Sequence, residues 1–211
     1  MVRITGGSLR GMRIPVPHTL QTRPTTDRVR EALFSILGEA CDGASVLDLF
    51  AGSGILGFEA LSRGGRQACF VDNSREVTRQ LQSSAGQLKL ADRVAVLQAG
   101  LEEKRVWEST VRKMTLQMGW NRAFNLVFLD PPYGQGWVPR ILSSLRTGDC
   151  LAEGALLVAE QERGAGLLTG LEGWELLNSR CYGGTELVFL KHRGSGRAVG
   201  REDSGTASPD A

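Results

Sequence analysis

The chain of 211 residues has few of the side chains that build metal sites and covalent catalytic centres. It contains two histidines, His18 and His192, and four cysteines that stand far apart, with no CxxC pair. These numbers argue against a zinc site, a disulfide framework and a catalytic triad that depends on histidine. We therefore expect no metal, and we interpret the cysteines as small side chains of the core.

Long apolar segments are also missing. No stretch approaches the roughly 18 consecutive apolar residues of a membrane-spanning helix. The first residues, MVRITGGSLRG, lack the apolar segment of a secretory signal. We expect a cytoplasmic monomer without a membrane partner. The length corresponds to one large domain at roughly 100–200 residues per domain.

The formal net charge of +2 conceals an uneven distribution. Residues 1–30 hold six arginines, no lysine and one acid, Asp27, whereas the remaining residues hold 19 basic and 22 acidic side chains. The protein is therefore a slightly acidic body with an arginine-rich N-terminal segment. Such asymmetry indicates an anionic partner, although a solvated basic arm explains it equally well.

The N-terminal residues predict a small hairpin followed by a helix. In residues 2–16, apolar positions are interrupted by glycines, and Pro15 and Pro17 end the pattern. In residues 29–40, apolar side chains recur at helical spacing, behind Pro24 and a capping threonine at position 25 or 26.

From residue 45 onward, short apolar runs alternate with amphipathic segments. The pattern predicts strands at 45–49, 68–71, 94–97, 126–129 and 155–159, with helices between them, which indicates an α/β fold with a parallel sheet covered on both faces. Two last runs, at 174–181 and 186–190, meet at two glycines and predict a hairpin. Residues 101–120 are amphipathic, and residues 194–211 are almost devoid of apolar side chains and are expected to be disordered.

A glycine-rich turn follows the first strand of this region. Residues 48–54 read Asp-Leu-Phe-Ala-Gly-Ser-Gly, and Gly52, Gly54 and Gly57 match GxGxxG, with Asp72 at the end of the next strand. Such a turn lets the backbone approach a ligand, and the second acid can bind ribose hydroxyls. A dinucleotide-dependent dehydrogenase is therefore one interpretation of this turn. Asp48 favours another, because a carboxylate repels a pyrophosphate but attracts the cationic S-adenosylmethionine.

The segment after the fourth strand carries the most specific chemistry. Residues 130–133 read Asp-Pro-Pro-Tyr, and the two prolines end the strand in a fixed turn at the carboxyl edge of the sheet. Asp130 and the Pro131 carbonyl can accept two hydrogen bonds from a planar NH2 group, and Tyr133 offers a ring for stacking. This set predicts an enzyme that acts on an amino group, with Asp130, Pro131, Pro132 and Tyr133 at its catalytic site.

These motifs resemble the class I S-adenosylmethionine-dependent methyltransferases of the amino-group type. The resemblance is closer to the RsmD family of 16S rRNA guanine-N2 methyltransferases. It extends from Arg3 to about Lys191 and includes Arg-Ile-x-Gly-Gly at residues 3–7 and Arg-Pro-Thr-Thr-Asp-Arg-Val-Arg-Glu-Ala-Leu-Phe at residues 23–34. The glycine turn, the segment Leu-Gly-x-Glu-Ala-Leu-Ser-Arg at 56–63 and Asp-Pro-Pro-Tyr complete it. The two N-terminal motifs make the resemblance specific to the RsmD family, because Asp-Pro-Pro-Tyr alone also occurs in DNA and protein methyltransferases.

The resemblance implies a Rossmann-like seven-stranded sheet with a C-terminal antiparallel hairpin, and methyl transfer to N2 of the guanine numbered 966. It implies an N-terminal RNA-facing hairpin extension at residues 1–22, a methyltransferase domain at 23–193 and a tail at 194–211. The implied S-adenosylmethionine site consists of Asp48, Phe50, Ala51, Gly52, Ser53, Gly54, Asp72, Asn73, Gln98 and Ala99. Gln98 departs from the family, which more often has Asp or Asn there.

The implied partner is 16S rRNA or an assembling 30S subunit. The candidate RNA-binding residues are Arg3, Arg10, Arg13, Arg23, Arg28 and Arg30, of which the last three can instead fold back onto the protein. The segment 102–122 is longer than usual and is either a further RNA-facing surface or a helix that covers the sheet. A DNA adenine-N6 or protein glutamine methyltransferase, a dehydrogenase and a non-catalytic RNA-binding factor remain as alternatives.

Overall fold

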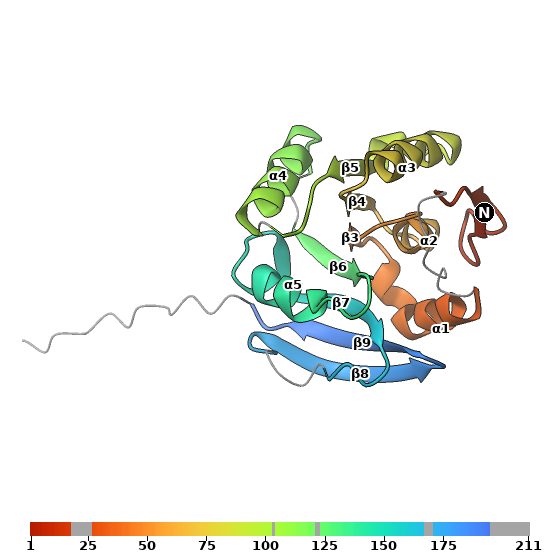
Figure 1. Cartoon of the computed structure of the whole chain (residues 1–211). Helices are drawn as coiled ribbons and strands as arrows, with labels where there is room; N and C mark the ends of the chain where they lie inside the picture. Colours follow the sequence, from red (N-terminus) through yellow and green to blue (C-terminus); the bar gives the residue numbers. More distant parts are fainter. Residues whose placement is uncertain (18–26, 103, 121–122, 167–170, 195–211) are drawn as a thin grey trace, which may run out of the picture.

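The computed structural model describes residues 1–17, 27–102, 104–120, 123–166 and 171–194. Its centre is a seven-stranded sheet in the order β5-β4-β3-β6-β7-β9-β8 (Figure 1). The parallel strands are β3 (Ser45–Leu49), β4 (Gln67–Asp72), β5 (Val94–Gln98), β6 (Phe124–Leu129) and β7 (Leu151–Glu162). The antiparallel strands are β8 (Trp174–Tyr182) and β9 (Thr185–His192). The predicted α/β fold with its C-terminal hairpin is confirmed.

Helices cover both faces of this sheet (Figure 1). Apolar side chains of α1 (Asp27–Leu37), α2 (Ile55–Ser62) and α3 (Arg75–Gln87) share one core with the sheet. Those of α4 (Lys104–Gln117) and α5 (Trp137–Arg146) share the other. Short 3-10 turns, η1 (Gly38–Cys41) and η2 (Ala91–Arg93), lead into β3 and β5. The buried strands lack polar alternation because helices exclude water from both faces.

The amphipathic segment after β5 packs as a helix against the sheet. Trp107 and Val111 of α4 are fully buried in the second core. Of the two interpretations of residues 102–122, the structure therefore bears out the helix that covers the sheet.

The N-terminal hairpin pairs β1 (Val2–Arg3) with β2 (Arg13–Ile14) and rests on α2. The Ser8 N–H donates to the Ser62 carbonyl at 2.7 Å, and the Leu9 N–H donates to Ser62 Oγ at 2.9 Å. A side chain at Gly7, which has a φ of +76°, would overlap the Ser62 carbonyl. The approach of the two backbones therefore requires glycine at this position.

Some expectations fall on parts of the chain that the structure does not describe. The expected helix cap at residues 24–26 and the expected disorder of residues 195–211 lie outside the described residues. The expectation for the cysteines is wrong at one position, because Cys181 is exposed on the edge strand β8 whereas the other three are buried. Among the described helices, none combines the length and the apolar character needed to cross a membrane.

Candidate active site

Acidic side chains gather where the parallel strands end. The β6–β7 register pairs Leu129 with Ala159, so Asp130 and Glu160 follow at the same level of neighbouring strands. Side chains at one level of adjacent strands project from the same face. Asp48 of β3, whose register partner is Phe128, also lies on this face, two residues before the level of Asp130. The three carboxyl groups form a row, called here the acidic row, across β3, β6 and β7.

The glycine turn between β3 and α2 is held by the neighbouring strand. The Gly52 N–H donates to Asp72 Oδ2 at 3.0 Å, and the Ser74 N–H donates to Asp72 Oδ1 at 2.9 Å. Gly52 and Gly54 have φ angles of 53° and 75°, which glycine adopts without strain. Phe50 has a φ of 57°, a conformation that is uncommon for a residue with a side chain. Asp72 thus fixes the backbone of the turn.

Asp48 lies beneath this turn and is 2 % exposed. Its Oδ2 accepts a hydrogen bond of 3.0 Å from the Gly57 N–H in the first turn of α2. Burial raises the pKa of Asp48 to about 8, and the nearby Asp72 acts in the same direction, although the bond from Gly57 opposes the shift. At neutral pH this carboxyl group therefore retains a proton until a positive charge approaches it.

Asn73, Gln98 and Ala99 of the predicted S-adenosylmethionine site lie at the ends of β4 and β5. The Ala99 N–H donates to the Asp72 carbonyl at 2.9 Å, which joins the two strand ends. Gln98 Nε2 donates to the Asn73 carbonyl at 3.4 Å, and both side chains are exposed. Gln98 and Asn73 therefore lie side by side, at the ends of the two strands that follow β3 in the sheet order.

The prolines of the Asp-Pro-Pro-Tyr segment separate a partly buried acid from an exposed ring. Burial raises the pKa of Asp130 well above its usual value, and the charges of Glu160 and Asp48 add to the shift. Pro131 is buried and Pro132 is exposed. Tyr133 has 43 % of its surface exposed, so its ring remains accessible to a ligand. A carboxylate, a carbonyl and an accessible ring thus occur within four residues.

The acidic row suits a cationic ligand. Among the described residues, neither Asp48 nor Asp130 forms an ion pair with a lysine or an arginine. Buried carboxyl groups that repel one another lower their energy when a cation binds beside them. The ammonium and sulfonium groups of S-adenosylmethionine would supply that charge next to Asp48, and Asp72 would face its ribose. The residues present therefore fit this donor.

Comparison with known proteins identifies the family. Residues 2–191 match the family described as Conserved hypothetical protein 95. The chain belongs to this family. It is 38% identical over 182 residues to the Escherichia coli protein named ribosomal RNA small subunit methyltransferase D, with 86% of this chain and 85% of that protein covered. The predicted membership of the RsmD family is thus confirmed.

Solved structures support the same fold. The Escherichia coli protein yhhF superposes with a TM-score of 0.75 at 34% identity, covering 92% of this chain and 98% of that one. An RNA methyltransferase from Salinibacter ruber, solved with S-adenosyl-L-homocysteine, has a TM-score of 0.55 at 16% identity, covering 81% and 94%. This member of the family therefore has the Rossmann-like methyltransferase fold. The predicted methyl donor, S-adenosylmethionine, is also confirmed. This family membership excludes the dehydrogenase alternative.

The N-terminal arginines of this family member divide into exposed and buried side chains. Arg10, Arg13 and Arg28 are exposed, as is Arg3, which pairs with Asp27 at 3.4 Å. Arg30 is fully buried. Its Nη2 donates to the Arg3 carbonyl at 2.6 Å and to Asp27 Oδ1 at 2.8 Å. Arg30 has therefore folded back onto the protein, and the RNA-facing alternative for it is wrong.

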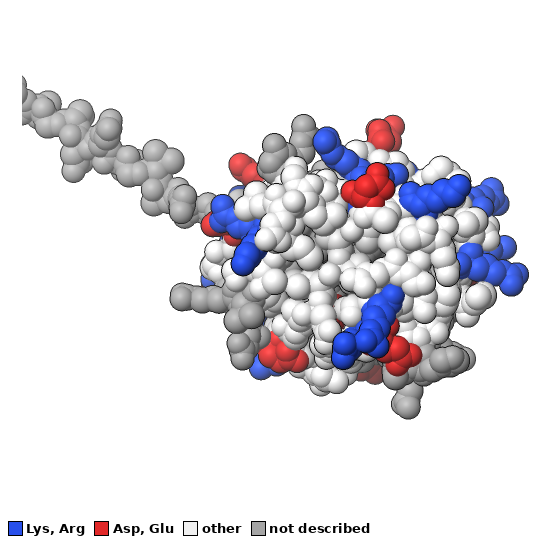
Figure 2. All heavy atoms as spheres, turned by 90° about the horizontal axis from the view of Figure 1, so that it is seen from above, with Lys and Arg blue, Asp and Glu red and all other residues white. Residues whose placement is uncertain are grey.

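Arg23 lies outside the described residues. Figure 2 shows that one face of the molecule carries its lysines and arginines singly or in small groups, with acidic side chains among them. On that face, basic side chains do not merge into one continuous patch.

Sequence reasoning missed Glu160, the third member of the acidic row. The apolar pattern ended the strand at residue 159, whereas β7 continues to Glu162. Glu160 is only 8 % exposed and accepts a hydrogen bond from Tyr133. The strand register against β6 was the only signal that could have placed it beside Asp130, and register is a tertiary property.

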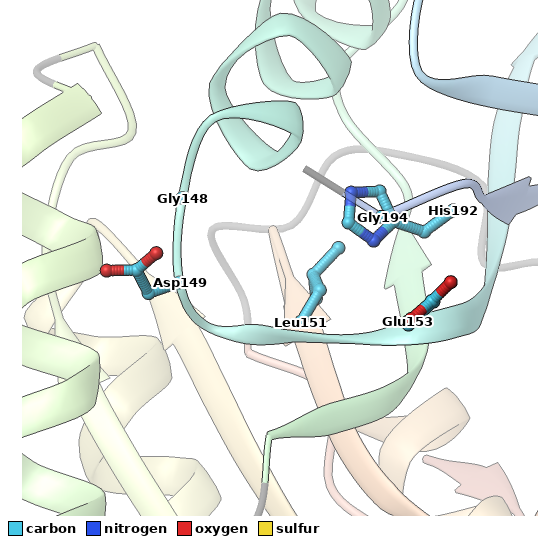
Figure 3. Close-up of a pocket in the computed structure, with 6 residues that line it drawn as sticks. All are labelled: Gly148, Asp149, Leu151, Glu153, His192 and Gly194. Atoms are coloured by element: carbon cyan, nitrogen blue, oxygen red, sulfur yellow. The ribbon is translucent and has the colours of Figure 1, made fainter. Parts of the chain in front are cut away.

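A cavity of about 240 Å³ lies at the opposite edge of the sheet, where β7 begins and β9 ends. Figure 3 shows Asp149, Leu151, Glu153 and His192 around it, together with Gly148 and Gly194. It contains none of the predicted site residues. Across the part of the chain that the structure describes, no group of three His, Cys, Asp or Glu side chains is arranged to hold a metal ion.

Proposed function

We propose that the protein methylates the exocyclic N2 of one guanine, of the position-966 type, in 16S rRNA of the small ribosomal subunit. S-adenosylmethionine is the methyl donor. The observation that carries the proposal is Asp130 with its Pro-Pro-Tyr turn, set in the acidic row beside the glycine turn. The relative named ribosomal RNA small subunit methyltransferase D supports ribosomal RNA as the substrate.

The Asp-Pro-Pro-Tyr segment matches the chemistry of a purine amino group. A guanine N2 carries two N–H donors in the plane of the base, and the Asp130 carboxylate and the Pro131 carbonyl would each accept one. The exposed ring of Tyr133 would stack on the base. A base reaches that ring only after it leaves its own stack, so a single-stranded loop of the RNA is the favoured target.

The residues of the site promote transfer by orientation and by charge. S-adenosylmethionine supplies a methyl group attached to a cationic sulfur. Asp130 and the Pro131 carbonyl hold the target nitrogen by its hydrogens and turn its lone pair out of the purine plane. As the nitrogen–carbon bond forms, the methyl–sulfur bond would break and leave neutral S-adenosylhomocysteine. The nitrogen loses one proton, and the Asp130 carboxylate accepts it. The raised pKa of Asp130 makes this carboxylate a better proton acceptor than an ordinary aspartate.

Basic residues near the N-terminus would contact the RNA backbone. Arg3, Arg10, Arg13 and Arg28 are exposed, and guanidinium groups match the geometry of phosphates. These contacts position the substrate without reading its sequence. The proposed partner is 16S rRNA, either naked or within an assembling 30S subunit.

The product identifies the reaction. The recombinant protein is incubated with S-adenosylmethionine and with unmodified 16S rRNA, either as a naked transcript or assembled into 30S particles. Nucleosides from the digested RNA are then separated by mass spectrometry. We expect N2-methylguanosine in at least one of the two samples. Formation of N6-methyladenosine instead, or no methylated nucleoside in either sample, would contradict the proposal.

Asp130→Ala separates amine recognition from donor binding. We expect methyl transfer to fall by at least about 100-fold, because a hydrogen-bond acceptor and the proton acceptor are both lost. Affinity for S-adenosylmethionine, measured by calorimetry, should change by less than about threefold. Asp92→Ala, which removes an exposed acid from η2, is the matched control. Full turnover by the Asp130 variant would refute the role of this residue.

A further inference from the structure

The hydroxyl of Tyr133 is fixed by two strands that lie beyond β6. It donates to Glu160 Oε1 on β7 at 2.9 Å and lies 3.0 Å from Thr185 Oγ1 on β9. Glu160 is buried, and its hydrogen bond with Tyr133 is partly buried. The ring of Tyr133 is exposed, but its far end is therefore anchored at a defined point of the sheet.

Glu160 also acts on Asp130 through space. The two carboxyl groups stand at the same level of β6 and β7, on the same face. The negative charge of Glu160 opposes ionisation of Asp130 and is the largest electrostatic contribution to its raised pKa after burial. One buried side chain thus contacts the stacking ring and influences the group that accepts the proton.

We propose that Glu160 is a positioning residue of the methyl-transfer site. Through Tyr133 it fixes the ring on which the target base stacks, and through its negative charge it makes the ionised Asp130 a stronger acceptor for the amine proton. The inference rests on the proposed function, since both roles concern the target amine. Thr185 completes the anchor from β9.

Substitutions can separate the two roles. Glu160→Gln keeps an oxygen that can accept the hydrogen bond from Tyr133 but removes the charge. Tyr133→Phe keeps the ring and the charge of Glu160 but removes the anchoring hydroxyl. Thr185→Val removes only the second hydrogen-bond partner. Glu160→Ala removes both functions of Glu160.

The sign of the pH effect follows from the groups that face Asp130. These are Glu160 from β7, Asp48 from β3 and the hydroxyl of Tyr133. Asp130 must be ionised to accept hydrogen bonds from the amine, so kcat rises with pH as Asp130 loses its proton. Removal of the charge of Glu160 lowers the pKa of Asp130. The acidic limb of the kcat profile should then move to lower pH.

The experiment measures kcat and KM against pH for the full-length protein with 16S rRNA and S-adenosylmethionine. We expect Glu160→Gln to shift the acidic limb downward. Tyr133→Phe should leave that limb in place and lower kcat by about fivefold at saturating RNA. Thr185→Val should show a weaker form of the same loss. Glu160→Ala should both shift the acidic limb and lower kcat. Glu160→Gln should show the shift but keep the part of kcat that depends on the hydrogen bond with Tyr133.

Glu153→Gln is the matched control, because Glu153 is an exposed acid at the opposite end of the same strand. Its pH profile and kcat should equal those of the wild type. If the wild type forms N2-methylguanosine, an unchanged acidic limb in Glu160→Gln or an unchanged kcat in Tyr133→Phe would overturn the inference. If the wild type forms no N2-methylguanosine, the proposed function fails instead. Affinity for S-adenosylmethionine shows that each variant is folded.

Discussion

At the scale of single residues, the site depends on carboxyl groups held away from water. Asp48 has its pKa raised to about 8 mainly by burial, and it accepts a hydrogen bond from the Gly57 N–H. A cation that binds near it favours the ionised form. Donor binding and the loss of a proton from Asp48 are therefore linked.

This linkage predicts that S-adenosylmethionine binds with release of protons. At pH 7, below the pKa of Asp48, the free protein carries a proton that the complex loses. Calorimetry at pH 7 in two buffers of different ionisation enthalpy should reveal that release. Affinity should rise from pH 6 to pH 8 and then level off. Asp48→Asn should bind the donor at least about tenfold more weakly and show a reduced proton release.

The stabilities of the wild type and of Asp48→Asn test the raised pKa of Asp48 without any ligand. Asp48 holds its proton up to about pH 8 in the folded chain but only up to about pH 4 in the unfolded chain. The wild type should therefore lose free energy of unfolding, relative to Asp48→Asn, as the pH rises between these values. Denaturant titrations at pH 5 and pH 8 measure the difference. An equal difference at both values would show that Asp48 ionises normally.

At the scale of elements, a buried polar cluster joins the N-terminal hairpin to α1 and α2. Glu59 of α2 is fully buried and accepts hydrogen bonds from the Thr5 N–H at 2.7 Å and from Arg63 Nε at 2.8 Å. Arg30 of α1 lies 3.7 Å from Glu59. Arg63 also stands over the Phe34 ring at 5.1 Å. Three elements thus meet at one carboxylate.

Glu59→Ala should destabilise the fold by about 3–5 kcal/mol, because it leaves the buried Arg30 without this carboxylate. Urea unfolding measures the change. Glu31→Ala, an exposed acid of α1, should cost less than about 0.5 kcal/mol. Arg30→Met should recover part of the loss when combined with Glu59→Ala. Equal stability of Glu59→Ala and the wild type would show that this cluster does not join the elements.

At the scale of the whole molecule, the basic N-terminal segment is part of the folded body. Ile4 and Ile14 of this segment are buried in the core that α1 and α2 share with the sheet. Removing residues 1–16 would therefore destabilise the protein as well as remove charge. Charge substitutions at exposed arginines test RNA binding without that complication.

Replacing Arg10, Arg13 and Arg28 with Gln should weaken binding of 16S rRNA uniformly and reduce its dependence on salt. Three lost phosphate contacts correspond to a decrease of roughly two to three in the slope of log affinity against log salt. Fluorescence anisotropy at several salt concentrations measures the slope. Arg66→Gln with Arg79→Gln removes exposed charge elsewhere and serves as the control. An unchanged slope in the triple variant would place the RNA interface on another surface.

Most of the architecture could be predicted because it follows from local patterns. Every predicted strand of the sheet and the C-terminal hairpin are present, with ends that shift by a few residues. The helical spacing of apolar side chains in residues 29–40 includes Leu33 and Leu37, which are buried in α1, but also Ile36, which is 41 % exposed. Arg30, which is not part of that pattern, is buried. A buried arginine cannot be predicted from periodicity, because its partner Glu59 comes from a different helix.

The order of the elements, the glycine turn, the Asp-Pro-Pro-Tyr segment and the family they indicate follow from the amino-acid sequence. Hydrophobic periodicity and fixed spacing are local properties, and they can be read along one chain. Three-dimensional packing was needed to show that Glu160 stands beside Asp130 and holds Tyr133, and that Arg30 faces inward. These contacts join residues that are distant along the chain, so strand register and helix packing had to be known before the electrostatics of the site could be derived.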